Sequence, residues 1–324
     1  MIHTEKLTRT FGSGKDAVEA VRGVDLDVSA GELVAFLGPN GAGKSTTLRM
    51  LTSLLSPTSG SARVAGVDVT AHPAEVRSRI GYIGQKDGAG YNYRVRDELL
   101  MQGRFYGLSR DESARRGSSL LASLDLEGME MRKVSTLSGG QKRRLDIALG
   151  LIHEPSLLFL DEPSTGMDPQ NRANLWEHIM RLREERGTTI VLTTHYLEEA
   201  DTMAERVVVI DHGRIIADDT ADALKAEQAG DRISLTVAAA DVVTTRAVVD
   251  QVGSELTESP TDEGVRIDFR VDRATRTLPR LVHALGDKGV DVLEASAHQP
   301  TLDDVFLNLT GRSLREAVET GAEA

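Results

Sequence analysis

Apolar residues follow two distinct patterns along the first part of the chain. Residues 33–37, 157–160 and 189–192 are short, almost uninterrupted apolar runs. Runs of this length are typical of parallel strands that helices cover on both faces. Residues 18–28 instead alternate apolar and polar side chains, which indicates a half-buried antiparallel strand. We therefore expect an α/β fold with a parallel core and a separate antiparallel region.

Helical patterns and turn signals fill the intervals between these predicted strands. Residues 92–125 predict helices joined by short loops, since glycine and serine residues break the pattern at intervals. Residues 207–210 and 214–217 flank an Asp-His-Gly turn, which predicts a β-hairpin. The helical stretch resembles a subdomain inserted into the α/β core.

The pattern of elements restarts near residue 231. Strands are expected at residues 233–237, 265–271 and 292–297, and helices at residues 244–252 and 278–289. This order predicts a small α+β domain over residues 231–312. Thr301, followed by Asp304, predicts the N-cap of a last helix that runs through Leu309. The polar residues 313–324 are expected to form a flexible tail.

Length, charge and composition limit the class of protein. At 324 residues the chain is too long for one ordinary core, so two domains are expected. The net charge of −12 argues against a general nucleic-acid binder, and no nucleic-acid partner is expected. No apolar run approaches the roughly 20 residues that cross a bilayer, and the first residues lack the pattern of a secretory signal. The absence of cysteine excludes disulfides and fits the cytosol.

The segment that follows the first apolar run fits a phosphate-binding loop, Gly-x-x-x-x-Gly-Lys-Ser. In such a loop backbone N–H groups surround phosphate oxygens, Lys44 reaches the β- and γ-phosphates, and the Ser45 hydroxyl ligates Mg²⁺. A glycine-rich turn with a chance lysine is the alternative, but the position between a strand and a helix favours phosphate binding. The residues expected to bind ATP here are Gly38, Pro39, Asn40, Gly41, Ala42, Gly43, Lys44, Ser45 and Thr46.

Two acidic residues close the second apolar run. Asp161 can hold Mg²⁺ through a coordinated water, and Glu162 can orient or deprotonate an attacking water. Taken alone, the pair could be surface carboxylates at a strand end. The third run is followed by His195, and ligands of open α/β sheets bind beyond the carboxyl ends of the strands. Asp161, Glu162 and His195 are therefore expected to meet the phosphate-binding loop in one pocket.

Residues 137–141 read Leu-Ser-Gly-Gly-Gln and precede a helix-like stretch with apolar residues at helical spacing. Lys142, Arg143 and Arg144 are expected in its first turn, where cations oppose the helix dipole, so a nearby anion would explain them. A flexible loop followed by a solvated basic face is the alternative, and it stays open for Lys142 and Arg143.

Residues 2–220 resemble the ATP-binding subunit of an ATP-binding cassette (ABC) transporter. The pentapeptide 137–141 matches the family signature letter for letter, and its distance from Lys44 leaves room for a helical insertion but not for a long coiled-coil arm. The resemblance implies an ATPase with a P-loop NTPase fold over residues 1–220, built from a mixed sheet core, an antiparallel β subdomain and a helical subdomain at about residues 88–155.

Further site residues are implied by the resemblance. Phe11 would stack on adenine, although an ordinary core phenylalanine is the alternative. Gln85 would contact Mg²⁺ or water and relay its state to the membrane subunit. His195 would contact the γ-phosphate, and Asp168 would lie in the loop that crosses a dimer interface. With Glu162, the catalytic set is then Glu162, His195 and Gln85, and the metal set is Ser45, Gln85 and Asp161.

The resemblance also implies a second copy of the chain. Ser138, Gly139, Gly140 and Gln141 would bind the γ-phosphate held by Lys44 of the opposite subunit, so ATP would join the two halves of a homodimer. Closure with ATP and opening after hydrolysis would then be a ligand-driven population shift.

The ending at residues 299–312 is similar to that of ATPase subunits of daunorubicin-type drug-resistance exporters. Such subunits imply a separate membrane permease, export of hydrophobic antibiotics or lipids, and a peripheral position on the cytoplasmic face of the cell membrane. A soluble ABC ATPase acting on a macromolecular complex is the alternative; members of that kind usually carry two cassettes or long coiled coils, and this sequence has neither. The C-terminal domain is expected to stabilise the dimer or regulate it.

Overall fold

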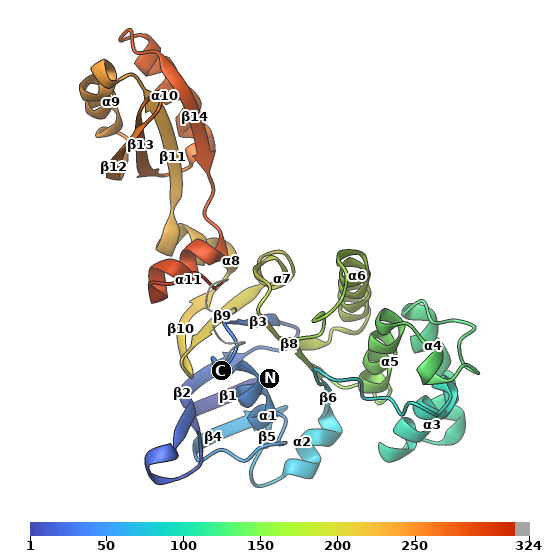
Figure 1. The fold of residues 1–324 in the computed structure, drawn as a ribbon. Helices are drawn as coiled ribbons and strands as arrows, with labels where there is room; N and C mark the ends of the chain where they lie inside the picture. Colours follow the sequence, from blue (N-terminus) through green and yellow to red (C-terminus); the bar gives the residue numbers. More distant parts are fainter. Residues whose placement is uncertain (315–324) are drawn as a thin grey trace. The chain divides into compact units, whose positions relative to one another are not determined.

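The apolar runs of the sequence form the central strands of a six-stranded sheet (Figure 1). The sheet order is β10-β9-β3-β8-β7-β6, and every residue of β3, β7 and β8 is buried. All neighbouring pairs are parallel except the β9–β10 hairpin. The strand bounds are Leu33–Leu37 for β3, Ile80–Ile83 for β6, Leu157–Asp161 for β7, Thr189–Thr194 for β8, Arg206–Asp211 for β9 and Arg214–Asp219 for β10. The predicted parallel core and hairpin are confirmed. The computed structural model describes residues 1–314.

A second, antiparallel sheet has the order β2-β1-β4-β5. Its strands are β1 (Ile2–Phe11), β2 (Val18–Val28), β4 (Ser59–Val64) and β5 (Val67–Asp68). The prediction for residues 18–28 is confirmed: Val24, Leu26 and Val28 are buried, while the aspartates between them are exposed. These side chains share one core with α1 (Lys44–Leu51) and the first sheet, so the phosphate-binding loop is supported from both sides.

Helices complete the first unit, which consists of Met1–Thr220 together with the buried Leu314. Helices α3, α4 and α5 lie together in Figure 1, and α5 contacts β6. The predicted helices within residues 92–125 are α3 and α4. The bounds are Pro73–Arg79 for α2, Val95–Phe105 for α3, Arg110–Ser123 for α4, Gly139–Leu151 for α5, Pro169–Arg186 for α6 and Leu197–Met203 for α7, with 3₁₀ turns at Gly14–Asp16 and Val134–Thr136. No helix within residues 1–314 is both long and apolar enough to cross a membrane.

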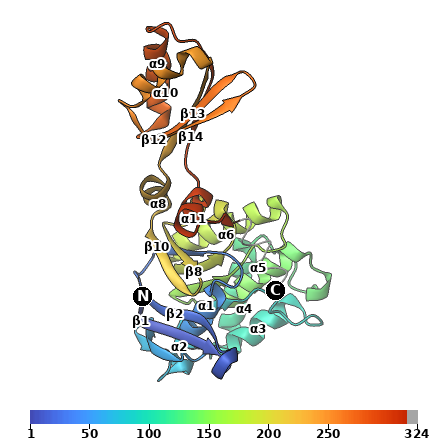
Figure 2. The same cartoon turned by 60° about the vertical axis from the view of Figure 1, so that its left-hand side comes forward.

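The second unit, Ala221–Ser313, contains a four-stranded antiparallel sheet of order β12-β13-β11-β14 (Figure 2). The β-α-β-β-α-β order of its elements is ferredoxin-like. Ile233, Phe269 and Leu285 are fully buried between the sheet and its helices. The bounds are Ala221–Leu224 for α8, Asp231–Val237 for β11, Val242–Val249 for α9, Gly253–Thr261 for β12, Gly264–Val271 for β13, Ala274–Gly286 for α10, Val292–His298 for β14 and Leu302–Thr310 for α11, with a π-helical turn at Lys225–Ala229 and a 3₁₀ turn at Ala239–Asp241.

Sequence patterns located most of these elements but missed β12. All of its side chains are exposed or half-buried, so it carries no alternation of apolar and polar residues. The predicted cap of the last helix is confirmed, since Thr301 and Asp304 form a capping box at the start of α11. Residues 221–230 belong to the second unit, whereas the sequence pattern restarts at 231. The predicted tail falls mainly on residues 315–324, outside the described part of the chain.

Candidate functional site

The phosphate-binding loop joins β3 to α1, and its glycines are required by the backbone. A Cβ atom on Gly38 would lie 2.1 Å from the carbonyl oxygen of Ile210. Gly43 has a φ of 104°, a conformation that side chains disfavour, and a Cβ there would lie 2.5 Å from the carbonyl oxygen of Ala20. The loop is thus held tightly against its neighbours, and α1 begins directly after it at Lys44. A helix N-terminus in this position favours an anionic ligand.

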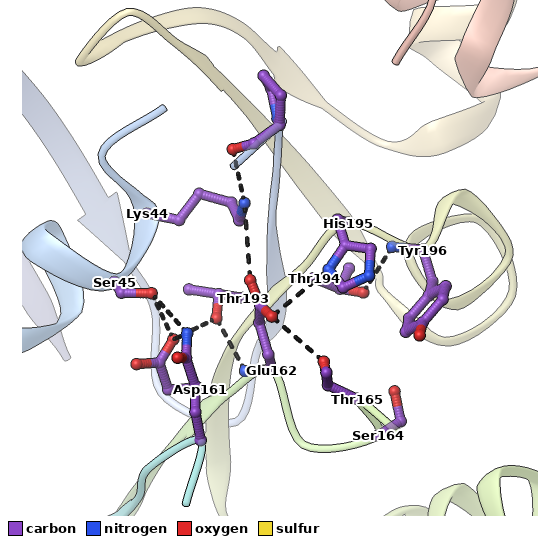
Figure 3. A network of polar contacts seen from close by, with 12 residues as sticks. Lys44, Ser45, Asp161, Glu162, Ser164, Thr165, Thr193, Thr194, His195 and Tyr196 are labelled. Atoms are coloured by element: carbon purple, nitrogen blue, oxygen red, sulfur yellow. Dashed lines mark hydrogen bonds and ion pairs between the residues drawn. The ribbon is translucent and has the colours of Figure 1, made fainter. Parts of the chain in front are cut away.

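Lys44 places a buried ammonium at the centre of the site (Figure 3). Its Nζ donates to the carbonyl oxygens of Gly38 (2.6 Å) and Pro39 (2.9 Å), and lies 3.9 Å from Oε1 of Glu162. Burial lowers the pKa of Lys44, and the carboxylates of Glu162 and Asp161 oppose that shift. The ammonium therefore contacts the loop carbonyl groups and the carboxylate that follows β7, and it lies where it can also contact a bound polyphosphate.

The three residues expected to bind metal lie together. The Ser45 hydroxyl donates to Oδ1 of Asp161 at 2.8 Å, and the Gln85 side chain lies 3.2 Å from the Ser45 hydroxyl. Thr193, at the end of β8, also donates to Oδ1 of Asp161 at 2.8 Å. Thr193 was missed in the sequence because a threonine inside an apolar strand gives no signal of its own. Its hydroxyl holds the aspartate toward the phosphate-binding loop.

Glu162 follows β7 with a φ of 47°, a left-handed conformation that is rare for a non-glycine residue. Its N–H donates to the hydroxyl and carbonyl oxygens of Thr193, which hold this backbone in place. The carboxylate accepts from Thr165 at 3.2 Å and lies 3.5 Å from Nδ1 of His195. Burial alone would raise the pKa of Glu162, but His195, Lys44 and Thr165 outweigh it and the pKa is lowered. Glu162 is thus ionised at neutral pH and oriented toward the phosphate-binding loop.

His195 follows β8 and completes this side of the site. Its buried Nδ1 faces Oε2 of Glu162 at 3.5 Å and makes no closer hydrogen bond within residues 1–314. The ring packs tilted against Tyr196, with ring centroids 4.2 Å apart. Figure 3 shows His195, Glu162 and Lys44 converging from three separate segments.

The Leu-Ser-Gly-Gly-Gln segment starts helix α5 with a capping box rather than a flexible loop. Oγ of Ser138 accepts from the N–H of Gln141, and Oε1 of Gln141 accepts from the N–H of Ser138. Because α5 begins at Gly139, Arg143 and Arg144 lie in its second turn, not the first as predicted. Arg143 is buried and donates to backbone carbonyl oxygens, so neither a ligand anion at the helix start nor a solvated basic face explains it.

The signature segment, Glu162 and Asp168 line one cavity of about 420 Å³. Asp168 caps α6: its carboxylate accepts from the N–H and side chain of Asn171, and these bonds lower its pKa. The lining residues are Gln85, Asp87, Ser138, Gly139, Gly140, Arg143, Glu162, Pro163, Thr165, Gly166, Met167, Asp168 and Asn171.

Phe11 lies apart from the core at the end of β1. Its side chain is 41 % exposed, so the alternative of an ordinary core phenylalanine is wrong. The guanidinium of Arg9 lies over the ring, 4.7 Å from its centroid. An exposed aromatic face of this kind is available to a flat ligand.

Comparisons with known proteins agree with this geometry. Residues 21–165 match the family model for the ABC transporter domain. The daunorubicin resistance ATP-binding protein DrrA2 of Streptomyces coeruleorubidus is 42 % identical, over 96 % of this chain and 95 % of that protein. The daunorubicin/doxorubicin resistance ATP-binding protein DrrA of Streptomyces peucetius is 40 % identical, over 98 % and 96 %. A dimeric ATP-binding cassette solved in a post-hydrolysis state with ADP and Pi has a TM-score of 0.63 and 26 % identity, over 68 % of this chain and 98 % of that one.

Proposed function

The chain belongs to the ATP-binding subunits of ABC transporters, and from this premise we propose that it drives export of a hydrophobic drug, antibiotic or lipid through a separate permease. Members of this family hydrolyse ATP. The observation that carries the proposal is the meeting of Lys44, Ser45, Asp161 and Glu162 at one sheet edge in a chain whose similarity to drug-resistance ATPases extends over nearly its whole length. The alternative of a soluble ATPase that acts on a macromolecular complex is not favoured by these relatives.

The site fits a magnesium ion bound together with ATP. Ser45 and Asp161 bring a hydroxyl and a carboxylate oxygen within 2.8 Å of each other, and Nε2 of Gln85 lies within 3.5 Å of both. Oxygen ligands suit Mg²⁺, and Gln85 would turn its amide oxygen toward the ion. Ser45 and Gln85 would hold the ion directly and Asp161 through a water. When bound, Mg²⁺ neutralises negative charge on the phosphates. The phosphate loop, Gly38 through Thr46, holds the triphosphate with its N–H groups, and Phe11 stacks on the adenine.

Hydrolysis is assigned to Glu162. The ionised carboxylate takes a proton from a water whose oxygen attacks the γ-phosphorus, while the bond to the β–γ bridging oxygen breaks and releases ADP and phosphate. His195 lies beside this carboxylate and contacts the γ-phosphate. Lys44 offsets charge on the phosphates from the opposite side. Gln85, from the loop after β6, would contact the attacking water.

A second copy of the chain completes each ATP site. Ser138, Gly139 and Gly140, with Gln141 fixing their turn, would contact the γ-phosphate on Lys44 of the other copy, and Asp168 would lie at the interface. The capping box supports this assignment, because it fixes the first turn of α5 and leaves the N–H groups of Gly139 and Gly140 without an intrahelical partner. The dimeric cassette with ADP and Pi is a precedent for such an assembly.

Helix α3 offers a surface for the permease. A cavity of about 540 Å³ is lined by Asp97, Leu100, Met101, Arg104, Phe105 and Arg110. Phe105 is 77 % exposed, and Tyr91 and Tyr93 are also exposed nearby in the sequence. Tyr106, in contrast, is half-buried and stacks on His153, so it contributes less to this surface. We assign this surface to an intracellular segment of the permease, which would hold the chain at the cytoplasmic face of the membrane.

Co-expression with candidate permeases encoded beside the gene tests the proposal. We expect recovery of the chain with membranes only when its permease is present, and loss of that recovery in Phe105→Asp. Val243→Asp is the matched control, because Val243 is 80 % exposed in the other unit. A parent chain that stays in the supernatant with every such permease would refute the transporter role. Normal recovery of Phe105→Asp would refute only the docking surface.

A further inference from the structure

Helix α5 buries two opposite charges one turn apart. Arg143 and Asp146 are each only 6 % exposed, although the helix otherwise buries apolar residues. A buried ion pair is costly to desolvate, so the hydrogen bonds around it decide whether it is tolerated. The hydrogen-bond partners of both side chains lie outside the helix, in segments distant in the sequence.

Asp146 holds the loop that carries Gln85. Its Oδ1 accepts from the backbone N–H groups of Gly88 (3.0 Å) and Ala89 (3.2 Å). A Cβ on Gly88 would lie 3.3 Å from this oxygen, so glycine allows the close approach of the loop. The loop joins β6 to α3 and contains no helix or strand, which leaves Asp146 as a main anchor of its middle part.

Arg143 contacts the backbone beside both Gln85 and Glu162. Its guanidinium donates to the carbonyl oxygen of Gly84 (2.6 Å), directly before Gln85, and to that of Pro163 (2.7 Å), directly after Glu162. Its Nη1 lies 4.0 Å from Oδ2 of Asp146. One planar guanidinium thus spans the segments of both Gln85 and Glu162, which a flexible ammonium could not do.

We infer that Arg143 and Asp146 are positioning residues for ATP hydrolysis, which fix Gln85 and Glu162 relative to each other and tie both to the helix that begins at Ser138. The inference rests on the proposed function, since it takes Gln85 and Glu162 as the acting groups. Because α5 is a continuous helix, these contacts connect Ser138 at its start with the Gln85 loop and with the segment after Glu162.

Hydrogen exchange of the full chain tests the contact itself. In Asp146→Ala, exchange of the Gly88 and Ala89 amides should be about 10- to 100-fold faster, the factor expected when a hydrogen bond to a charged acceptor is lost. In Asp146→Asn the side-chain oxygen remains, and exchange should stay within about threefold of the parent. Glu177→Ala, which removes an exposed carboxylate paired with Arg181 on α6, is the control and should leave these amides unchanged.

Steady-state kinetics test the positioning role. For Asp146→Ala we expect kcat to fall about tenfold or more with the KM for ATP within about twofold of the parent, because the phosphate-binding loop is untouched. Asp146→Asn should restore most of kcat. Arg143→Lys keeps the charge but cannot reach both carbonyl groups, so kcat should fall as in Asp146→Ala. This variant tests the positioning role if Asp146→Ala does not fold.

Two results distinguish failure of the positioning role from failure of the proposed function. A parent that hydrolyses ATP, with kcat unchanged in Asp146→Ala or Arg143→Lys, would overturn the inference alone. A parent that hydrolyses no ATP would overturn the proposed function and the inference together. Unchanged exchange at Gly88 and Ala89 in a folded Asp146→Ala would show that the carboxylate does not hold the loop.

Discussion

The charge on Asp146 has a consequence for stability that can be measured with one substitution. Burial raises the pKa of Asp146 from 3.8 to about 6, although the N–H of Gly88 and the charge of Arg143 oppose the shift. A carboxyl group with a raised pKa in the folded state binds its proton more tightly there than in the unfolded chain. The protonated carboxyl group therefore stabilises the folded state fully at a pH below its pKa in the unfolded chain. This contribution is lost as the pH rises through about 6, the pKa in the folded state. Asp146→Asn removes this titration and keeps the acceptor oxygen.

The expected magnitude follows from the shift. A pKa raised from 3.8 to about 6 makes the ionised carboxylate cost about 3 kcal/mol of stability at neutral pH. The free energy of unfolding of Asp146→Asn, relative to the parent, should therefore rise by about 2 kcal/mol between about pH 4.5 and about pH 8.

Urea unfolding followed by tryptophan fluorescence is a suitable assay. Trp176 is the sole tryptophan of the chain and is buried in α6, so its emission reports the unfolding of the ATP-binding unit. Asp111→Asn, at an exposed position in the first turn of α4, is the matched control, and water screens such a charge. A difference between Asp146→Asn and the parent that stays flat, or shrinks, toward high pH would refute the reasoning.

Four other changes have defined outcomes. Lys44→Ala should abolish ATP binding in calorimetry, because the loop loses its buried cation; an unchanged affinity would remove the phosphate-binding assignment. Glu162→Gln should bind ATP but turn over about 100-fold more slowly or worse, and elute as a dimer with ATP in size-exclusion chromatography; hydrolysis at the parent's rate would show that another group is the base. Phe11→Ala should weaken ATP and ADP binding about tenfold if the ring stacks on adenine, and equal affinities would contradict that role. A chain lacking residues 231–324 should still bind ATP, since the loop and its core lie within Met1–Thr220, and failure of the remainder to fold would contradict this boundary.

Local patterns were sufficient for the strands that build the site. The run at residues 157–160 is apolar because both faces of β7 are covered, so its hydrophobicity alone predicted a buried parallel strand. The meeting of the phosphate-binding loop with Asp161, Glu162 and His195 also followed, since the carboxyl ends of parallel strands share one edge of the sheet. The sequence pattern did not predict β12, because an exposed edge strand needs no apolar face.

The contacts of the basic residues after the signature segment could not be predicted from the sequence. The sequence placed Arg143 near the start of a helix, where the helix dipole disfavours a cation, and so predicted contact with an anion or with solvent. In the fold its guanidinium meets backbone carbonyl groups of Gly84 and Pro163, and Asp146 meets the N–H groups of Gly88 and Ala89. Periodicity and motif spacing predicted the central strands and the phosphate-binding loop, because both depend on neighbours along the chain. Which segments the buried pair joins depends on contacts between residues far apart in sequence, and only the tertiary structure decided them.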